Sequence, residues 1–102
     1  RLLASASKDM TVRIWDVHEA QQMQLLQAHF DGADALSFSP DGELLATGGR
    51  DSTIKLWRVA DGELLTTFDD HNKPVMTLSF NPAGTLLASG SGDNSVRLWA
   101  VR

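Results

Sequence analysis

Hydrophobic and polar residues alternate in short runs along most of the chain, and this alternation predicts β-strands. In the run TIKLW, Ile54 and Leu56 fall on one side of a strand, while Lys55 and Trp57 fall on the other. The related runs TVRIWDV and SVRLWAV occur before and after it. No stretch has the spacing of three and four residues that an amphipathic helix requires. The pattern therefore predicts an all-β chain.

Turn residues separate these runs. The segments ADALSF and VMTLSF are each followed by a turn, SPDG or NPAG, in which Pro presets φ and Gly42 or Gly84 supplies a positive φ. The next segments, ELLATG and TLLASG, are apolar at consecutive positions, which predicts strands buried on both faces. A weaker fourth strand is predicted over residues 23–28 and again over residues 63–68.

The alternation breaks once in two of the predicted strands. Val75 and Leu78 both belong to the predicted core but are three residues apart, and Ala33 and Leu36 repeat this spacing. A β-bulge adds one residue to a strand and so returns both members of a pair to the same face. We therefore expect a bulge near Met76 and a second one in the equivalent strand.

The runs repeat with a period of 42 residues. Trp15, Trp57 and Trp99 keep this interval, as do Leu3, Leu45 and Leu87, so the chain holds about 2.4 repeats. Four strands per period with two apolar faces cannot bury themselves and must stack on similar sheets. Radial stacking of this kind gives a β-propeller made of four-stranded antiparallel blades.

The strand count predicts an incomplete propeller. We expect ten strands in groups of three, four and three: a partial blade over residues 1–28, a complete blade over residues 29–70 and a partial blade over residues 71–102. Known propellers close with at least about 4 blades. We therefore expect a segment of a longer chain whose remaining blades complete the ring. Self-association through the open blade faces and completion by a partner are the alternatives.

Composition narrows the classes of function. The 102 residues are 42% hydrophobic and 22% charged, typical of a folded domain, and the net charge of −4 argues against a nucleic-acid partner. The absence of Cys excludes disulfides, thiolate zinc sites and cysteine nucleophiles, and no apolar run is long enough to span a membrane. We expect a cytoplasmic protein, or a nuclear one in a eukaryote, without a membrane partner.

The repeated phrases ASASKDMTVRIW, ATGGRDSTIKLW and ASGSGDNSVRLW resemble the WD40 repeat family over the whole chain. The family's Trp-Asp pair survives once, as Trp15-Asp16, and its Gly-His pair is changed to Ala28-His29 and Asp70-His71. The resemblance implies a structural tetrad in each blade, in which Trp, hydroxyl, imidazole and carboxylate are linked by hydrogen bonds. The implied sets are His29, Thr47, Asp51 and Trp57; His71, Ser89, Asp93 and Trp99; and Ser5, Asp9 and Trp15.

The same residue types could form a catalytic triad of Ser89, His71 and Asp93. Three features argue against it: one copy carries Thr, the set is repeated, and no G-x-S-x-G segment surrounds either hydroxyl. The acidic residues around His29 and His71 lack a recognised metal-ligand spacing. The sequence thus predicts no catalytic residue, metal or cofactor. Lys55, Arg13 and Arg97 are expected to extend their charges toward solvent at the blade edge.

In similar propellers the face that carries the tetrad loops is the usual binding surface. The positions on that face lie around the first-strand bulge and just before the turn Asp. The candidates are Gly32, Asp34, Pro74, Met76, Lys8, Arg50 and Gly92, followed by Phe30 and Lys73. Met76 is the strongest candidate for partner contact, because a flexible apolar side chain at an exposed bulge suits a contact surface.

The resemblance favours a non-enzymatic scaffold for protein–protein interaction, with proteins or peptides as partners. A regulatory or sensor array fused to a signalling enzyme, such as a kinase or an NTPase, is the alternative. A propeller enzyme or small-ligand binder is a third class, and it would need polar groups that converge near the axis.

Overall fold

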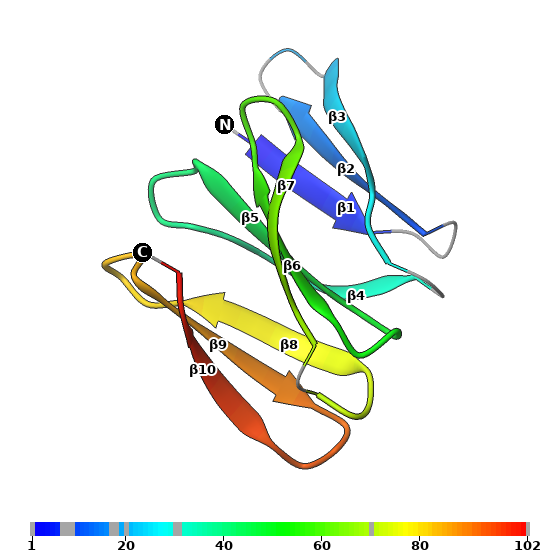
Figure 1. Cartoon of the computed structure of the whole chain (residues 1–102). Helices are drawn as coiled ribbons and strands as arrows, with labels where there is room; N and C mark the ends of the chain where they lie inside the picture. Colours follow the sequence, from blue (N-terminus) through cyan, green and yellow to red (C-terminus); the bar gives the residue numbers. More distant parts are fainter. Residues whose placement is uncertain are drawn as a thin grey trace.

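A computed structural model of the chain describes residues 2–6, 10–16, 19, 21–29, 32–69 and 71–101. The described residues form strands joined by turns, and Figure 1 shows them as a succession of three sheets. The strands are β1 (Leu2–Ala6), β2 (Thr11–Asp16), β3 (Gln21–Gln27), β4 (Ala33–Phe38), β5 (Leu44–Gly49), β6 (Ile54–Arg58), β7 (Glu63–Phe68), β8 (Val75–Phe80), β9 (Leu86–Ser91) and β10 (Val96–Ala100).

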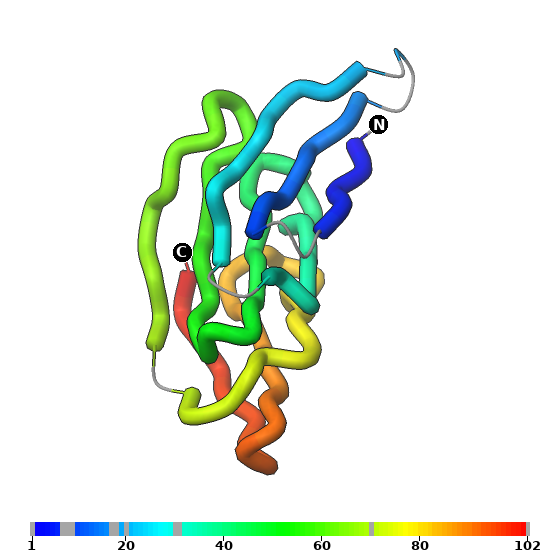
Figure 2. The backbone as a smooth tube through the Cα atoms, turned by 90° about the vertical axis from the view of Figure 1, so that its right-hand side faces the viewer, coloured from blue at the N-terminus to red at the C-terminus, as the bar shows by residue number. Residues whose placement is uncertain are grey.

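Each sheet is antiparallel and follows the order of the chain. Sheet I contains β1-β2-β3, sheet II contains β4-β5-β6-β7, and sheet III contains β8-β9-β10. Sheet II lies between the other two, and contacts of β1 with β4 and of β8 with β4 and β5 join neighbouring sheets (Figures 1 and 2). The predicted all-β fold of propeller blades is therefore confirmed, and its strands are grouped as three, four and three among the described residues.

The local patterns explain the limits of three strands and the shape of two turns. Strands β4, β7 and β8 have the predicted limits, and Gly42 and Gly84 have φ values of 74° and 73° in the turns after β4 and β8. The register shifts between Ala33 and Ala35 and between Val75 and Thr77, so the two expected bulges are present. Each bulge adds a residue to the strand, at Asp34 and at Met76.

Strand β3 differs from the prediction. It begins at Gln21 and ends at Gln27, whereas the apolar pattern indicated residues 23–28. The difference arises because Gln21 and Gln22 pair with Asp16 and Trp15 of β2. Backbone pairing does not depend on side-chain polarity, so polar residues extend this edge strand beyond its apolar part.

The apolar core forms two clusters, one between sheets I and II and one between sheets II and III. Val12, Ile14, Leu45 and Trp57 belong to the cluster between sheets I and II. Ile54, Leu56, Val75 and Leu87 belong to the cluster between sheets II and III. Ile54 and Leu56 thus face one neighbour and Trp57 the other, as alternation along β6 predicts.

Burial on both faces is confirmed for β5 but not for β9. Every residue of β5 is buried, because sheets I and III cover the two faces of sheet II. In β9, Leu87 is buried but Leu86 is exposed. The prediction for β9 was wrong because no described sheet covers the outer face of sheet III.

Candidate partner-binding site

A chain of hydrogen bonds crosses sheet II beneath its loops. The Trp57 indole N–H donates to Thr47 Oγ1 over 2.9 Å, and Thr47 Oγ1 lies 2.7 Å from His29 Nε2. His29 Nδ1 lies 3.0 Å from Asp51 Oδ1. Because the indole can only donate and the carboxylate can only accept, the pattern assigns the Nδ1–H tautomer to His29, with the Thr47 hydroxyl donating to Nε2.

Sheet III carries the equivalent arrangement. The Trp99 indole N–H donates to Ser89 Oγ over 2.9 Å, and Ser89 Oγ lies 2.7 Å from His71 Nε2. His71 Nδ1 lies 3.3 Å from Asp93 Oδ2, which also accepts the backbone N–H of Asn72 over 3.1 Å. The structure therefore brings together both four-residue sets that the sequence suggested.

Sheet I shows part of a third set. The Trp15 indole N–H donates to Ser5 Oγ over 3.1 Å. Asp9 lies outside the described residues. The pair Ser5 and Trp15 keeps the same relation as Thr47 and Trp57, since each pair joins facing strands of its sheet.

A fifth member of the network was missed by the sequence analysis. Thr53 donates its hydroxyl to Asp51 Oδ1 over 2.7 Å and its backbone N–H to the same oxygen over 3.1 Å. Ser95 makes the same two hydrogen bonds to Asp93. The signal was present as Asp-x-Thr or Asp-x-Ser, which recurs with the period of 42 residues.

The turn after each Asp has an unusual backbone. Ser52 and Asn94 have φ values of 70° and 67°, and Met10, one further period before Ser52, has 74°. A positive φ costs about 1–3 kcal/mol for a residue other than glycine, so the surrounding contacts must hold it. In sheets II and III the hydrogen bonds of Thr53 and Ser95 hold the turn in this shape.

Burial and hydrogen bonds keep the network in one protonation state. Burial lowers the pKa of His29, although the neighbouring Asp51 opposes this, so the imidazole is neutral near pH 7. Burial alone would raise the pKa of Asp51, but hydrogen bonds from Thr53 and the proximity of His29 lower it. The hydrogen bond from Ser95 is the main reason that the pKa of Asp93 is well below its usual range.

These networks are closed to a substrate. Thr47 is fully buried and Ser89 is 1% exposed, and each hydroxyl takes part in hydrogen bonds to both an indole and an imidazole. A nucleophile must reach its substrate, and these hydroxyl oxygens cannot. In sheet II the arrangement fixes the loop before β4 to the turn between β5 and β6. In sheet III it fixes the loop before β8 to the turn between β9 and β10.

The loops fixed in this way expose several of the predicted contact residues. Met76 is 65% exposed at the bulge of β8, and Pro74 and Lys73 precede it as exposed residues. Lys73 makes no ion pair within the described part of the chain. The sheet III loops therefore present an apolar side chain close in sequence to a cation that has no ion pair among the described residues.

The sheet II loops present a different surface. Arg50 Nε lies 3.0 Å from Asp34 Oδ2, so these two predicted residues neutralise each other. Backbone hydrogen bonds from Arg50 to Gly32 and from Gly92 to Pro74 join the two loops of each sheet. The remaining candidates, Lys8 and Phe30, lie outside the described residues.

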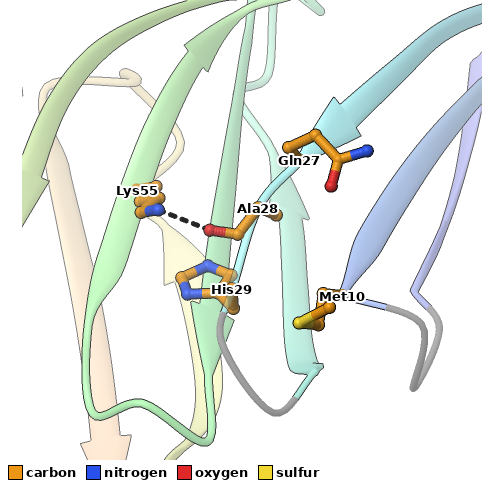
Figure 3. Close-up of a pocket in the computed structure, with 5 residues that line it drawn as sticks. All are labelled: Met10, Gln27, Ala28, His29 and Lys55. Atoms are coloured by element: carbon orange, nitrogen blue, oxygen red, sulfur yellow. Dashed lines mark hydrogen bonds between the residues drawn. The ribbon is translucent and has the colours of Figure 1, made fainter.

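Lys55 does not extend to solvent as expected. Its Nζ donates to the backbone oxygen of Ala28 over 2.5 Å, so the charge turns toward the segment before β4 (Figure 3). The prediction was wrong because that carbonyl offers the ammonium a hydrogen bond inside the sheet contact. With Met10, Gln27 and His29, these residues line an open pocket of about 180 Å³. The Nε atoms of Arg13 and Arg97, at the same position of their repeats, are also shielded from solvent.

A metal site or a membrane-spanning helix would point to other classes of function. In that part of the chain, no group of three or more His, Cys, Asp or Glu side chains is placed to hold a metal ion. The same residues contain no helix that is long and apolar enough to cross a membrane.

Comparison with known proteins places the repeats in a family. The family model for the WD domain, G-beta repeat, matches residues 1–16, 20–58 and 62–100. Over 42 residues, human coronin-7 is 48% identical, with 41% of this chain and 4% of that protein covered. The nuclear distribution protein PAC1 of Coccidioides posadasii is 49% identical over 41 residues, covering 40% of this chain and 9% of that protein. The matched segments thus span less than a tenth of the length of these two curated relatives.

A solved structure extends the similarity to the whole chain. The crystal structure of the computationally designed Ika4 protein superposes with a TM-score of 0.88 at 32% sequence identity. The match covers 99% of this chain and 61% of the designed one. The three sheets therefore have the same mutual arrangement as part of that protein.

Proposed function

The chain belongs to the WD40 repeat family, and from this we propose that it is a non-enzymatic scaffold that binds a protein or peptide through its tetrad-loop face. WD40 domains generally bind other proteins and are generally non-catalytic. The tetrad-loop face is here the surface formed by Lys73, Pro74, Met76 and Gly92 of sheet III together with Asp34 and Arg50 of sheet II.

The observation that carries the proposal is the exposure of Met76 at a bulge whose loop is held by hydrogen bonds. A methionine that is 65% exposed loses apolar contact with water when a partner covers it. The loop around it is joined by the hydrogen bonds from Gly92 to Pro74 and from Ser91 Oγ to the Lys73 carbonyl. A surface that is already ordered loses little conformational entropy when a partner binds.

Charge indicates the chemistry of the partner. Arg50 and Asp34 form an ion pair on sheet II, so neither of these two charges is left to attract a partner. Lys73 has no ion pair among the described residues and lies in the loop that leads to Met76. We therefore propose a partner segment with an apolar side chain for Met76 and a carboxylate for Lys73.

A phage-displayed library of random linear peptides tests this proposal. Peptides selected on the immobilised chain are synthesised, and their binding is measured by calorimetry to the wild-type chain and to Met76→Asp. We expect selected sequences that combine acidic and apolar residues, and a loss of affinity of at least about tenfold for Met76→Asp.

Leu64→Asp is the matched control, because Leu64 is also exposed but lies on β7, away from the tetrad loops. This variant is expected to bind as the wild type does. The proposal is wrong if the selected peptides bind Met76→Asp undiminished, or if no peptide is enriched above a heat-unfolded sample.

A further inference from the structure

The tetrad loops of sheets II and III have the same backbone frame but carry different side chains. Arg50 and Gly92 are 42 residues apart, and each donates its backbone N–H over 3.1 Å to the carbonyl of the residue two places before the bulge. Asp34 is the bulge residue in sheet II, and Met76 is its counterpart in sheet III. The side chains at these two pairs of positions can therefore be compared directly.

In sheet II the side chain before the turn Asp lies against the bulge. The Nε of Arg50 is 3.0 Å from Oδ2 of Asp34, and the two side chains are 46% and 37% exposed. Sheet II has a neighbouring sheet on both of its faces. These positions are therefore accessible from the loop side even in a sheet that is covered on both faces.

In sheet III the same position carries no side chain. A Cβ built on Gly92 would meet, among the described residues other than its chain neighbours, only Lys73 Cβ, at 3.7 Å. The backbone does not require glycine there, because the φ of Gly92 lies outside the left-handed region. The place that the Arg50 side chain occupies in sheet II is thus left open at Gly92, next to the bulge that carries Met76.

The groups around this open position favour an aromatic side chain. The thioether of Met76, which is 65% exposed, can make favourable contacts with an aromatic ring. The Lys73 side chain begins beside the open position, and an ammonium group is attracted to the face of such a ring. An aromatic side chain also has few rotatable bonds, so it loses little conformational entropy when it is held.

We infer that the partner is a peptide segment whose aromatic side chain occupies the open position at Gly92 and contacts Met76. A carboxylate beside the aromatic residue pairs with Lys73. Gly92 is then the residue that determines specificity, because any larger side chain takes the place of the aromatic ring. This inference rests on the proposed peptide-binding function and specifies which side chain of the partner enters the tetrad-loop face.

Gly92→Arg tests the inference by placing in sheet III the side chain that sheet II carries. Calorimetry with the peptides selected from the phage-displayed library is expected to show binding at least about tenfold weaker than to the wild type. The added cation by itself would strengthen the binding of an acidic peptide. A loss of affinity therefore identifies the filled position as the cause.

Two variants separate this effect from charge and from folding. Ala83→Arg adds the same cation at an exposed position in the turn between β8 and β9, at the other end of these strands, and should bind as the wild type does. Met76→Asp combined with Gly92→Arg recreates the ion pair of sheet II. This double variant is expected to unfold at nearly the same temperature as the wild type and to have lost peptide binding.

The aromatic residue of the peptide supplies a second measurement. Its replacement by Ala is expected to weaken binding to the wild-type chain by at least about tenfold. The same replacement should weaken binding to Gly92→Arg by less than about threefold, because the two changes remove the same contact.

The outcomes distinguish this inference from the proposed function. Selected peptides without a shared aromatic residue, or peptides that bind Gly92→Arg as tightly as the wild type, would overturn the inference. The proposed function would still stand if Met76→Asp weakened the binding of those peptides. Enrichment of no peptide would remove the proposed function and this inference with it.

Discussion

Thr47 is the residue on which the sheet II network depends, because its hydroxyl links Trp57 on one side to His29 on the other. The two polar rings it joins are at most 5% exposed, and a buried polar group without a partner costs about 1–3 kcal/mol. The network thus allows polar side chains to lie within an apolar sheet contact. Its energetic importance is tested most directly at its carboxylate end.

Asp51→Ala is expected to lower the free energy of unfolding by about 1–3 kcal/mol. The substitution removes the carboxylate that accepts from His29 Nδ1 and from Thr53, and so weakens both the imidazole contact and the turn. Urea unfolding at pH 7 measures the change. Asp69→Ala, an exposed carboxylate outside the network, is the control and should leave stability nearly unchanged. Equal midpoints for the two variants would contradict a bracing role for the network.

Thr53→Val is expected to reduce stability at neutral pH by about 1–2 kcal/mol, because it removes a hydroxyl hydrogen bond to an ionised carboxylate. The pKa of Asp51 is lowered in the folded protein, so its ionised carboxylate stabilises the fold. This stabilisation is present at pH values above the unfolded pKa of about 4 and is lost as the pH falls. Thr53→Val raises the pKa of Asp51 in the folded protein. The difference in free energy of unfolding between the variant and the wild type should therefore shrink as the pH falls below about 4.

Urea unfolding of both proteins at pH 7 and at about pH 3 checks the dependence on pH. The control is Thr67→Val, which removes a hydroxyl from the exposed strand β7. A loss for Thr53→Val that is the same at both pH values would show that the carboxylate is not involved.

At the scale of elements, strand β5 shows how closely the sheets approach. All of its residues are buried, and its two glycines lie where a neighbouring side chain meets the backbone. A Cβ on Gly48 would lie 2.6 Å from Val75 Cγ1, and one on Gly49 would collide with the ring of His29. The glycines thus leave room for Val75 of sheet III and for the tetrad imidazole.

Gly48→Ala is expected to destabilise the protein by about 1–3 kcal/mol, because the added methyl group overpacks the contact with Val75. Thermal unfolding followed by circular dichroism measures the change. Gly48→Ala combined with Val75→Ala should lose less stability than the sum of the two single variants, since the second change removes the Val75 methyl group that collides. Gly92→Ala is the control, because its Cβ would meet Lys73 Cβ at an ordinary 3.7 Å. Equal losses for the two alanine variants would show that crowding at β5 is not the cause.

At the scale of the molecule, stability comes from sheets that contact only their neighbours. The chain extends over 39 × 32 × 18 Å, and its two apolar clusters lie on opposite faces of sheet II. In an arrangement of this kind the stability is close to a sum of sheet and contact contributions. The two contacts should therefore respond independently to substitution.

Ile14→Val and Ile54→Val test this independence with the same change in each of the two clusters. Both side chains are fully buried, in different clusters, and each substitution should cost about 0.5–1.5 kcal/mol. The double variant should lose the sum of the two within about 0.5 kcal/mol, as measured by urea unfolding. Ile54→Val combined with Leu87→Ala, both in the cluster between sheets II and III, is the comparison that should depart from the sum. Strong coupling between Ile14 and Ile54 would argue against separate contacts.

The local pattern of residues was sufficient for most of the fold. The limits of β4, β7 and β8, the two bulges and the glycine turns depend on neighbours in the sequence, and these were predicted correctly. The limits of β3, the exposure of β9 and the direction of Lys55 were predicted wrongly. Each of these three depends on a segment distant in sequence, either as a pairing partner, as a covering sheet or as an acceptor.

The sequence by itself determined the period of 42 residues, the strand type and the sets of polar residues that recur together, because each follows from short-range spacing. Only the tertiary structure decided which apolar faces are buried, since burial requires a second sheet on the same face. It also showed that Thr53 and Ser95 join the tetrads and that Arg50 is paired with Asp34 while Lys73 has no such pair among the described residues. These facts depend on distances between side chains, which the spacing of residues along a strand does not specify.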